Sequence, residues 1–388
     1  MRPAPIYLDH AASTPVREEV VAAMQPFFGA RFGNPSSTHR WGREARTALD
    51  EARERVATCL GARADEVCFT SGGTEGDNLA ILGTWRLRRG SGRNAIVTTP
   101  IEHKAILGAA HQAAREGAEE RLLTVDGNGV VTDESFGAHV RDDVAVCSVI
   151  WVNNETGTIQ PIPAFSEQAT SKGVLMHTDA VQAFGKVPID AAAQRFDLLS
   201  ISGHKIGAPK GIGALFIRRG TKVEPLMHGG LQDRGRRPGT ENVAFAVGLA
   251  AAAELVLKEH DDECTRLSTL RDALEAAILA SIPDAVIHGR MADRAPHVTS
   301  ISVPGTDSES LLMALDLQGI AASGGSACQS GSVSPSHVLV AMGVSPGLAS
   351  AAIRMSLGAL TTGKCVERVA EVFPALVDKA RQLAVTGS

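Results

Sequence analysis

A lysine at the end of an apolar strand could form a covalent bond to a carbonyl compound. Lys205 closes the segment of residues 200–205 (Ser-Ile-Ser-Gly-His-Lys), and glycines follow at positions 207, 211 and 213. A lysine that only interacts with water at the protein surface would not need an apolar strand before it and Ser, His and Gly residues around it. A lysine in these surroundings is well placed for a Schiff base, the linkage through which an enzyme amine holds a carbonyl group. The alternative is an ordinary lysine at a strand end.

A carboxylate follows an earlier apolar strand. Asp179 lies in residues 177–182 (His-Thr-Asp-Ala-Val-Gln). A pyridoxal ring withdraws electrons only while its ring nitrogen is protonated, and a buried carboxylate keeps that proton in place. Gln182, three residues further on, would share the same helical face and could donate to the ring hydroxyl. Asp179 could instead be a simple helix N-cap, but together with Lys205 it favours a pyridoxal cofactor.

A glycine-rich turn between a strand and a helix could bind the phosphate of such a cofactor. Residues 69–75 read Phe-Thr-Ser-Gly-Gly-Thr-Glu. Gly73 would let the backbone approach a ligand, the helix N-terminus would present unpaired N–H groups, and Thr74 would add a hydroxyl donor. A Ser/Gly/Thr turn is more often only a helix cap, so it is informative only beside the other residues.

Two further polar side chains follow expected strands. His103 comes after residues 95–99, where an imidazole could stack on a flat ring and shuttle protons near neutral pH. Asn154 comes after residues 144–151 and could bind the ring hydroxyl. The simpler alternatives are a histidine at a helix start and an Asn/Gly turn. Each of these motifs alone is weak evidence, but together they indicate a pyridoxal site more specifically. Along the chain they follow in the order phosphate turn, His, Asn, Asp, Gln and Lys.

The second half of the chain holds two more candidates. Arg354 could bind a substrate carboxylate through paired hydrogen bonds. Cys328 lies in residues 322–332 (Ala-Ser-Gly-Gly-Ser-Ala-Cys-Gln-Ser-Gly-Ser), a run with almost no apolar anchors that we expect to be mobile and exposed. Reactive thiols are found in such exposed places. The six cysteines show no CxxC pair and no zinc-ligand spacing, so we expect neither a disulfide framework nor a resident metal.

The elements that must position these residues form an α/β pattern. Short β-branched runs alternate with amphipathic stretches, which predicts a mostly parallel sheet covered by helices on both faces. Ligand sites in such sheets gather at the carboxyl ends of the strands. The expected strands are residues 67–70, 95–99, 122–125, 144–151, 174–178, 198–202 and 214–218, and the expected helices between them are residues 75–89, 104–116 and 163–172.

The pattern changes after the glycine-rich residues 228–240. Helices are expected at residues 241–259 and 262–281, strands near 285–288 and 298–303, a helix at 308–317 and a last helix from 364. This pattern predicts a second, smaller α+β unit. We therefore expect a large domain of residues 15–258 and a small domain of residues 1–14 and 259–388.

The composition narrows the class of protein. The chain has 388 residues, of which 44% are hydrophobic and 21% charged, as in soluble globular proteins. A net charge of −5 argues against a surface for nucleic acid or for an anionic membrane. The N-terminus has no signal-peptide core, and the longest apolar run, residues 243–257, is too short to span a bilayer. We expect a cytoplasmic protein.

Together the motifs resemble the cysteine desulfurases, fold-type-I pyridoxal-phosphate enzymes of the class V aminotransferase group. The resemblance covers essentially the whole chain. It includes residues 7–12, 33–37, 70–78, 102–103, 152–157, 179–182, 202–205, 229–242, 326–328 and 354–358. The long Ser/Gly stretch around Cys328 is similar to the group that works in iron–sulfur cluster assembly and nitrogen fixation, whose loop delivers sulfur to a partner protein.

This resemblance implies a role for each matching residue. Lys205 would hold pyridoxal 5'-phosphate, and Cys328 would attack the sulfur of the cysteine–cofactor adduct, becoming a persulfide and leaving L-alanine. Arg354 and Asn34 would bind the substrate carboxylate, and Cys328 could also be a transient iron–sulfur ligand. The cofactor phosphate would contact Gly73, Thr74, Ser202 and His204, joined by Thr240 from the other subunit of a homodimer. His103 would stack on the cofactor ring and Asp179 would lie at the ring nitrogen. Asn154 and Gln182 would contact the ring hydroxyl.

Some points stay open at this stage. Leu231, Pro238 and Gly324 depart from the usual family residues, which are a glycine, a small residue and a serine. The loop of residues 234–237, rich in arginine, would lie near the dimer interface and the cofactor. A selenocysteine lyase or another pyridoxal-dependent aminotransferase-like enzyme would keep Lys205 and Asp179, although a simple transaminase has no need of Cys328. A non-catalytic sulfur-relay subunit is a third reading, and the final sulfur acceptor is not specified by the sequence.

Overall fold

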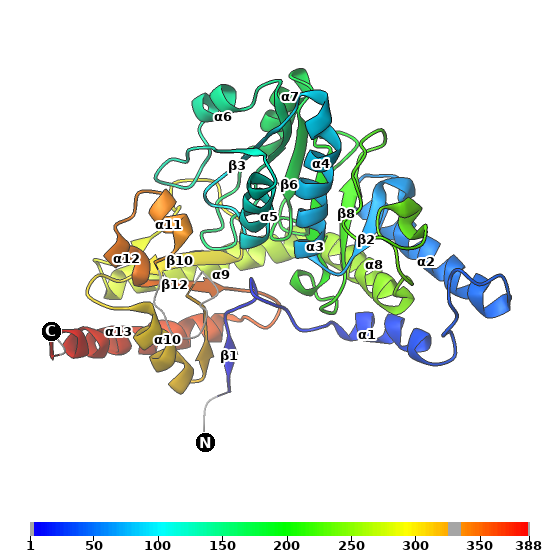
Figure 1. Ribbon diagram of the computed structural model, residues 1–388. Helices are drawn as coiled ribbons and strands as arrows, with labels where there is room; N and C mark the ends of the chain where they lie inside the picture. Colours follow the sequence, from blue (N-terminus) through cyan, green and yellow to red (C-terminus); the bar gives the residue numbers. More distant parts are fainter. Residues whose placement is uncertain (1–3, 325–334, 387–388) are drawn as a thin grey trace.

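The computed structural model describes residues 4–324 and 335–386, and a seven-stranded sheet forms its centre (Figure 1). The prediction of a mostly parallel seven-stranded sheet is confirmed, since only β8 runs against its neighbours. Across the sheet the strands are β2 (Val67–Thr70), β8 (Gly213–Ile217), β7 (Leu198–Ser202), β6 (Leu175–Asp179), β5 (Val144–Ser148), β3 (Ala95–Thr98) and β4 (Glu119–Leu122).

The antiparallel strand β8 has a local cause. Residues 203–212 join β7 to β8, and this connection is shorter than the dozen or more residues that a parallel crossover needs. The chain therefore turns back beside β7, and Ser202 pairs with Gly213. As a result the turn that carries Lys205 stays at the carboxyl end of β7.

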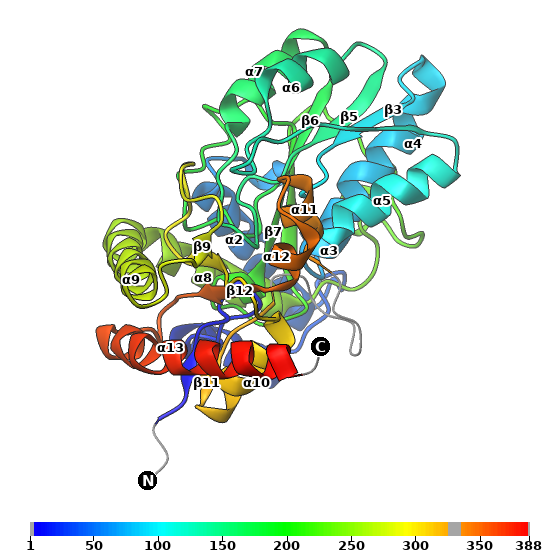
Figure 2. The same ribbon diagram turned by 90° about the vertical axis from the view of Figure 1, so that its left-hand side faces the viewer.

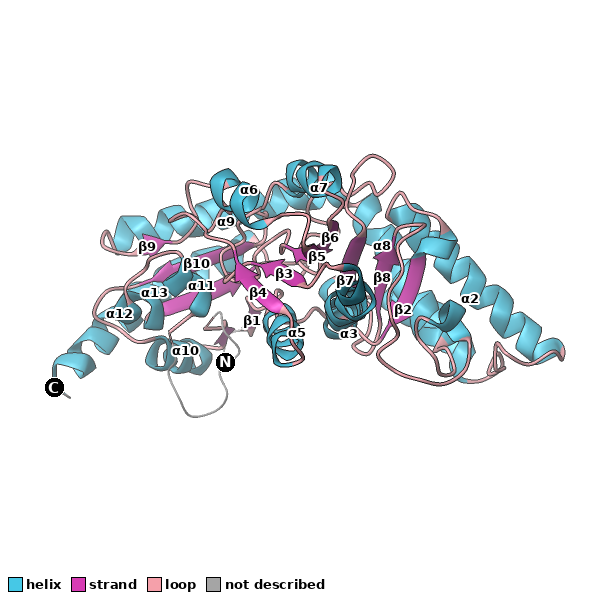
Figure 3. Ribbon diagram, turned by 45° about the horizontal axis from the view of Figure 1, so that its top comes forward, coloured by secondary structure: helices cyan, strands magenta, loops and turns pink. Residues whose placement is uncertain are grey.

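Both faces of the sheet are buried, because successive residues of one strand enter different cores. Val67 and Phe69 of β2 pack in one core, whereas Cys68 between them packs with Leu79 and Leu198 in another. Figure 3 shows α6 and α7 on one side of the strands and α3 and α5 on the other. The covering helices are α2 (Arg40–Cys59), α6 (Asp133–His139), α7 (Ile162–Ser171) and α8 (Val243–Lys258) on the first face, and α3 (Gly73–Asn78), a π-helical turn (Leu79–Gly83), α4 (Thr84–Arg88) and α5 (Lys104–Arg115) on the second.

A second core lies below the large sheet. Strands β9 (Val286–Ile287), β10 (Val298–Ser302) and β12 (Ala352–Ser356) form an antiparallel sheet, and β1 (Ile6–Tyr7) pairs in parallel with β11 (Ile320–Ala321). Figure 2 shows α13, β11 and α10 together at the lower end of the molecule. The helices here are α9 (His260–Ser281), α10 (Ser308–Leu317) and α13 (Gly363–Thr386), with α1 (Glu18–Met24), α11 (His337–Ala341) and α12 (Pro346–Ser350) outside this core.

Residues from both ends of the chain share this second core. Leu8 packs in it with side chains of α9 and α13, as the expected pairing of residues 1–14 with the C-terminal part requires. The domain bounds themselves, 15–258 against 1–14 and 259–388, stay a prediction. None of the helices in residues 4–324 and 335–386 combines the length and apolar character that a membrane crossing needs.

One expected strand was placed wrongly. β4 spans Glu119–Leu122 rather than residues 122–125. It is one of the two edge strands of the described sheet and pairs with β3, and Arg121 within it forms ion pairs with Glu119 and Asp143. Because an edge strand tolerates charged residues, hydrophobicity did not reveal its start.

Candidate active site

A pocket of about 330 Å³ lies at the carboxyl ends of the parallel strands. This volume is within the range of about 300–1,000 Å³ that small-molecule sites occupy. Ten of the residues singled out in the sequence line it, and they come from five strand ends and from β12: Gly73, Thr74, His103, Asn154, Asp179, Gln182, Ser202, His204, Lys205 and Arg354. The fold therefore brings together side chains that are up to 281 positions apart (354 − 73).

Lys205 lies at the floor of this pocket in a 3₁₀ turn after β7 (Gly203–Lys205). Its Nζ donates to the carbonyl oxygens of Ala11 and Ala12, at 2.7 and 2.9 Å. Burial, together with the charge of Arg354, lowers the pKa of Lys205 to about 8, although Asp179 opposes this shift. The neutral amine is therefore far more abundant near physiological pH than in an ordinary lysine, which suits a nucleophile or a base.

Asp179 ends β6 and is 3% exposed. Its Oδ1 accepts a hydrogen bond from the backbone N–H of Val181 at 2.9 Å. Burial raises the pKa of Asp179, while the nearby His103 and Lys205 lower it. A carboxylate so placed would gain from a cation or a protonated ring nitrogen beside it.

Asp77 of α3 lies close to Asp179 and was not singled out in the sequence. One ligand atom each from Asp77, His103 and Asp179 lies within 4.8 Å of the other two. Asp77 is 1% exposed, and burial, with the charge of Asp179, raises its pKa well above the usual value. Two buried carboxyl groups this close do not both ionise readily, so Asp77 is the group that keeps a proton. A trio of this kind can also bind a metal ion, and the expected absence of a resident metal stays a prediction.

One end of the pocket is suited to a phosphate. α3 begins at Gly73, so unpaired N–H groups of its first turn are available there. A Cβ atom at Gly73 would lie 2.7 Å from Val181 Cγ2, which explains why glycine occupies this position. Ser202 and His204 line the same pocket, and His204 Nδ1 lies 3.3 Å from Ser13 Oγ.

His103 combines a local role with a place in the pocket, whereas the local role expected of Asn154 falls to its neighbour. His103 Nδ1 accepts from the Ala105 N–H at 3.2 Å and so caps α5. Burial lowers the pKa of His103, and Asp179 opposes this shift. The expected turn is formed by the neighbouring Asn153, whose Oδ1 accepts two backbone N–H groups, which leaves the Asn154 side chain to line the pocket.

Gln182 is held from two sides. Its Nε2 donates to the carbonyl oxygen of Ala11 at 2.8 Å, and its Oε1 lies 3.2 Å from His297 Nε2. Since the first bond fixes the amide orientation, the second requires His297 to donate from Nε2. The Gln182 amide is thereby fixed at the pocket wall.

Arg354 of β12 enters the pocket from the second core and is 5% exposed. Its Nη2 donates to Asp9 Oδ1 and its Nη1 to the carbonyl oxygen of Asn154, both at 2.8 Å. Its Nε is buried and has no hydrogen-bond partner among the described residues. The guanidinium is therefore fixed in place and keeps N–H donors for a carboxylate.

Comparisons with known proteins identify the family to which the chain belongs. The family model for class V aminotransferases matches residues 6–369. The chain is 44% identical over 379 residues to cysteine desulfurase IscS of Dictyoglomus turgidum, covering 98% of this chain and 96% of that protein. It is 45% identical over 382 residues to cysteine desulfurase NifS of Azotobacter vinelandii, covering 98% and 94%. The chain belongs to the cysteine desulfurases of the class V aminotransferase family.

A solved structure agrees with this desulfurase assignment. A NifS-like protein has a TM-score of 0.88 and 34% identity to this chain, covering 98% of this chain and 100% of that one. The resemblance seen in the motifs is thus confirmed, both for the family and for the fold.

Two described residues expected in the desulfurase site, Asn34 and Thr240, do not line this pocket. Asn34 is exposed, and its Oδ1 accepts the N–H of Ser36. Thr240 is exposed as well, and its expected contact is with another subunit. Cys328 lies outside the described residues.

The desulfurase pocket also contains residues that the sequence reading passed over. Asp77 follows the phosphate turn by only a few residues, in the first turns of a helix built of small and polar residues. This position could have indicated from the sequence that its carboxyl group lies near the pocket. Glu155 is 2% exposed and accepts from Ser336 Oγ at 2.5 Å. His337 Nε2 lies 3.0 Å from the carbonyl oxygen of Glu102. These last contacts join distant segments and had no local pattern.

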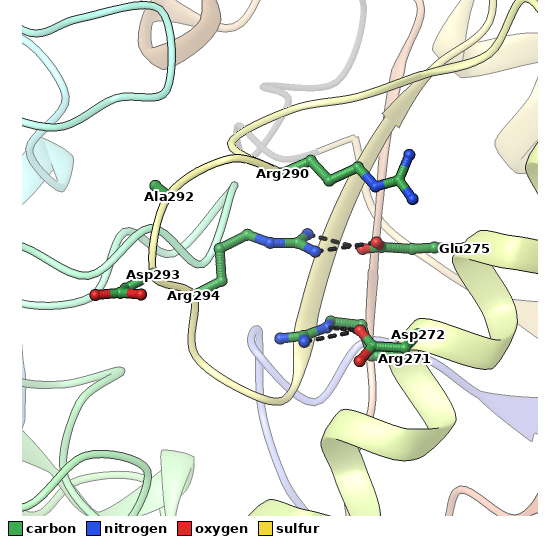
Figure 4. A pocket seen from close by; sticks show the side chains of 7 residues that line it. All are labelled: Arg271, Asp272, Glu275, Arg290, Ala292, Asp293 and Arg294. Atoms are coloured by element: carbon green, nitrogen blue, oxygen red, sulfur yellow. Dashed lines mark hydrogen bonds and ion pairs between the residues drawn. The ribbon is translucent and has the colours of Figure 1, made fainter.

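A separate charged pocket of about 340 Å³ lies between α9 and the loop of residues 290–294 (Figure 4). Arg294 donates to both oxygens of Glu275, at 2.7 and 3.0 Å, and Arg271 pairs with Asp272. Figure 4 shows Arg290 beside the paired Arg294 and Glu275. None of the described site residues that the sequence predicted lines this pocket, and the ion pair between Arg294 and Glu275 fastens the loop to α9.

Proposed function

We propose that this protein is a pyridoxal-phosphate-dependent cysteine desulfurase that converts L-cysteine into L-alanine and transfers the sulfur to Cys328 as a persulfide. The observation that carries the proposal is the meeting of Lys205, Asp179 and Arg354 in one pocket. An amine, an anion for a ring nitrogen and a carboxylate-binding guanidinium are the three groups that this chemistry requires.

The residues of the pocket fit the cofactor. Gly73 and the first turn of α3 offer N–H groups to a phosphate, and His204 and Ser202 add polar atoms beside them. Asp179 is a buried carboxyl group with a free oxygen, and Lys205 supplies the amine. When bound, the cofactor withdraws electrons from the amino acid and so weakens the bonds at its Cα and Cβ.

The protein residues bind and orient the substrate and move its protons. Arg354 binds the carboxylate of L-cysteine, while Asp9 and the Asn154 carbonyl keep its guanidinium fixed. The Lys205 amine, whose pKa is lowered to about 8, accepts and returns protons near the substrate Cα. Asp77 stays protonated beneath Asp179, so that Asp179 carries the negative charge toward the ring nitrogen.

Sulfur transfer to Cys328 balances without a further reactant. The Cys328 thiolate forms a bond to the substrate sulfur as the substrate Cβ–Sγ bond breaks. The electron pair of that bond and one proton go to Cβ, which becomes the methyl group of L-alanine. The substrate sulfur is oxidised to the persulfide level and Cβ is reduced, so no external oxidant or reductant is required.

The ends of the segment that contains Cys328 support this assignment. Ser323 lines the pocket and exchanges two backbone hydrogen bonds with Arg354, at 3.1 and 2.6 Å. On the far side of the segment, Ser336 donates to Glu155, which also lines the pocket. Cys328 follows Ser323 by five residues in the sequence.

A homodimer with Thr240 at the neighbouring phosphate site is part of the proposal. Several large apolar side chains are exposed near the N-terminus and in the loop of residues 228–240, and a second subunit could cover such a surface. These side chains are Val21, Phe28, Phe32, Trp41 and Leu231. Arg237 of that loop bonds Glu75 beside the phosphate turn at 3.0 Å. An acceptor protein for the sulfur and a cytoplasmic location also remain proposals.

The alanine released from L-cysteine tests the proposal. Wild-type protein should release alanine, and in the presence of a thiol reductant also sulfide, in equal amounts. Cys328→Ser should bind L-cysteine and perturb the cofactor spectrum as wild type does, yet release alanine at background rates, because a hydroxyl cannot accept sulfur as a persulfide. Cys365→Ser, a change of a half-buried cysteine away from the pocket, is the matched control. Alanine release by Cys328→Ser at the wild-type rate would favour a lyase without a persulfide.

A further inference from the structure

A second cavity, of about 430 Å³, adjoins the candidate active site. It lies between residues 14–19, the segment after β6, the end of α8 and residues 357–360. Val181, Gln182 and Lys205 line both this cavity and the active-site pocket. The two cavities therefore share a wall, although most residues of the second have no part in the proposed function.

Two buried histidines in this cavity have ring nitrogens that make no hydrogen bond within the described part of the chain. His10 is 4% exposed, and neither of its ring nitrogens has a partner among the described residues. His297 is 3% exposed, and while its Nε2 donates to Gln182, its Nδ1 has no partner in residues 4–324 and 335–386. Burying a polar atom without a hydrogen-bond partner is unfavourable, so buried polar atoms in native proteins are nearly always paired. Three unsatisfied nitrogens at one cavity point to a ligand.

His10 is packed closely against the backbone. A Cβ atom at Gly358 would lie 2.4 Å from His10 Nδ1 and 2.5 Å from its Cγ, so only glycine leaves room for the ring. Tyr7 contacts the same ring edge-on, with centroids 4.9 Å apart. The imidazole is therefore fixed at the cavity wall and does not have to be ordered when a ligand binds.

The cavity also has a lysine whose side chain makes no close ion pair with the described residues, although the charge of Glu263 acts on it. Arg17 is paired with Glu259 through bonds of 2.8 and 2.7 Å, and Arg266 is paired with Glu263 through two bonds of 2.7 Å. Lys186, by contrast, makes no side-chain hydrogen bond or ion pair within the described part of the chain. Burial lowers the pKa of Lys186, and a negatively charged ligand would offset this cost.

These groups define what the ligand must offer. Burial, and next the charge of Lys186, lower the pKa of His10 to about 4 and that of His297 well below its usual value, so both rings are neutral. Lys186 and one nitrogen of His10 are donors, which match a carboxylate. Since His297 donates from Nε2, its Nδ1 is an acceptor, which matches an O–H or N–H group.

We propose that this cavity binds a small 2-hydroxy or 2-amino acid. The carboxylate accepts from Lys186 and His10, and the adjacent O–H or N–H group donates to Nδ1 of His297. Val181, Phe184, Ile206 and Leu357 are among the apolar side chains that line the cavity, so a short apolar third substituent has apolar neighbours there. Because His297 also holds Gln182, a bound acid contacts the wall of the neighbouring site.

L-Lactate is the probe that separates this site from the active site. It carries a carboxylate and a hydroxyl but has no amino group through which to react with a pyridoxal cofactor. Titration calorimetry on the holoprotein should show one lactate per chain, with propionate, which lacks the hydroxyl, bound more weakly. Lys186→Met should weaken lactate binding by about tenfold or more, the effect of losing one charge-assisted hydrogen bond. L-Alanine, tested on the same proteins, shows whether amino acids share the site.

Two controls make the result decisive. Lys210→Met, a lysine outside this cavity, and Arg354→Lys should both bind lactate as wild type does. If Lys186→Met does not fold, His10→Phe, which keeps the ring and removes both nitrogens, serves in its place. No heat from lactate with wild-type protein would mean that only water fills the cavity. Binding that Arg354→Lys abolishes and Lys186→Met retains would assign it to the active site. Either result overturns the proposal without affecting the desulfurase assignment.

Discussion

Replacing Arg354 with lysine should weaken the binding of L-cysteine by about tenfold to a hundredfold. In the structure one nitrogen of Arg354 bonds Asp9 and another the Asn154 carbonyl, both at 2.8 Å, and N–H donors remain for a substrate. Lysine has a single nitrogen and no planar fork, so it cannot serve Asp9 and a carboxylate equally well. One charge-assisted hydrogen bond is worth about 1.5–3 kcal/mol, which gives the range above.

The loss should appear in substrate binding. If Arg354 binds the ground state and the transition state alike, KM rises and kcat changes little. Titration of the cofactor absorbance with L-cysteine measures the affinity, and alanine release gives kcat/KM. L-Cysteine methyl ester, which has no free carboxylate, should bind wild-type protein as weakly as the acid binds Arg354→Lys, and the variant should not distinguish acid from ester. An unchanged KM for the acid in a folded variant would refute the assignment of Arg354.

Three further outcomes follow from the pocket. Lys205→Ala should lose both the visible absorbance of the lysine-linked cofactor and all turnover, whereas Lys210→Ala should keep both, and spectra of the purified proteins decide. Because the pKa of Lys205 is lowered to about 8, its neutral form increases as the pH rises through that value, so cofactor-free protein should bind pyridoxal phosphate faster above pH 8 than below it. A rise that begins only near pH 10, where an ordinary lysine titrates, would contradict this shift. Gly73→Ala should raise the cofactor Kd about tenfold, because the new Cβ would lie 2.7 Å from Val181 Cγ2 and overpacking of this kind costs about 1–3 kcal/mol. Equilibrium dialysis measures this Kd, and an unchanged wild-type value would contradict the expectation.

The positions of most site residues could be predicted because each follows a buried strand. β2 and β7 have the expected bounds, and β6 and β8 differ by one residue at each end. Parallel strands expose their carboxyl ends at one edge, so Lys205, Asp179 and His103 had to lie near one another once the sheet was predicted. Arg354 was different, because its place depends on how the second core packs against the first, so its residue type suggested a role in binding a carboxylate but no strand order placed it in this pocket.

The partners of these residues could not be predicted from local patterns. Asp9 reaches Arg354 across 345 positions of sequence, and Ala11 accepts from both Gln182 and Lys205 because the N-terminal segment passes beneath the pocket. His297 bonds Gln182 across 115 positions. Such contacts depend on tertiary packing, and neither periodicity nor turn chemistry specifies them.

The central claim is that Cys328 receives the sulfur, and the mass of the peptide that contains it tests this most directly. Wild-type holoprotein is incubated with L-cysteine without reductant, the free thiols are blocked, and the digested peptides are weighed. We expect the mass of one additional sulfur on the Cys328 peptide, formed at the rate of the first alanine release and absent from Lys205→Ala. Alanine release with no added sulfur on that peptide, or with the sulfur on another cysteine, would contradict it.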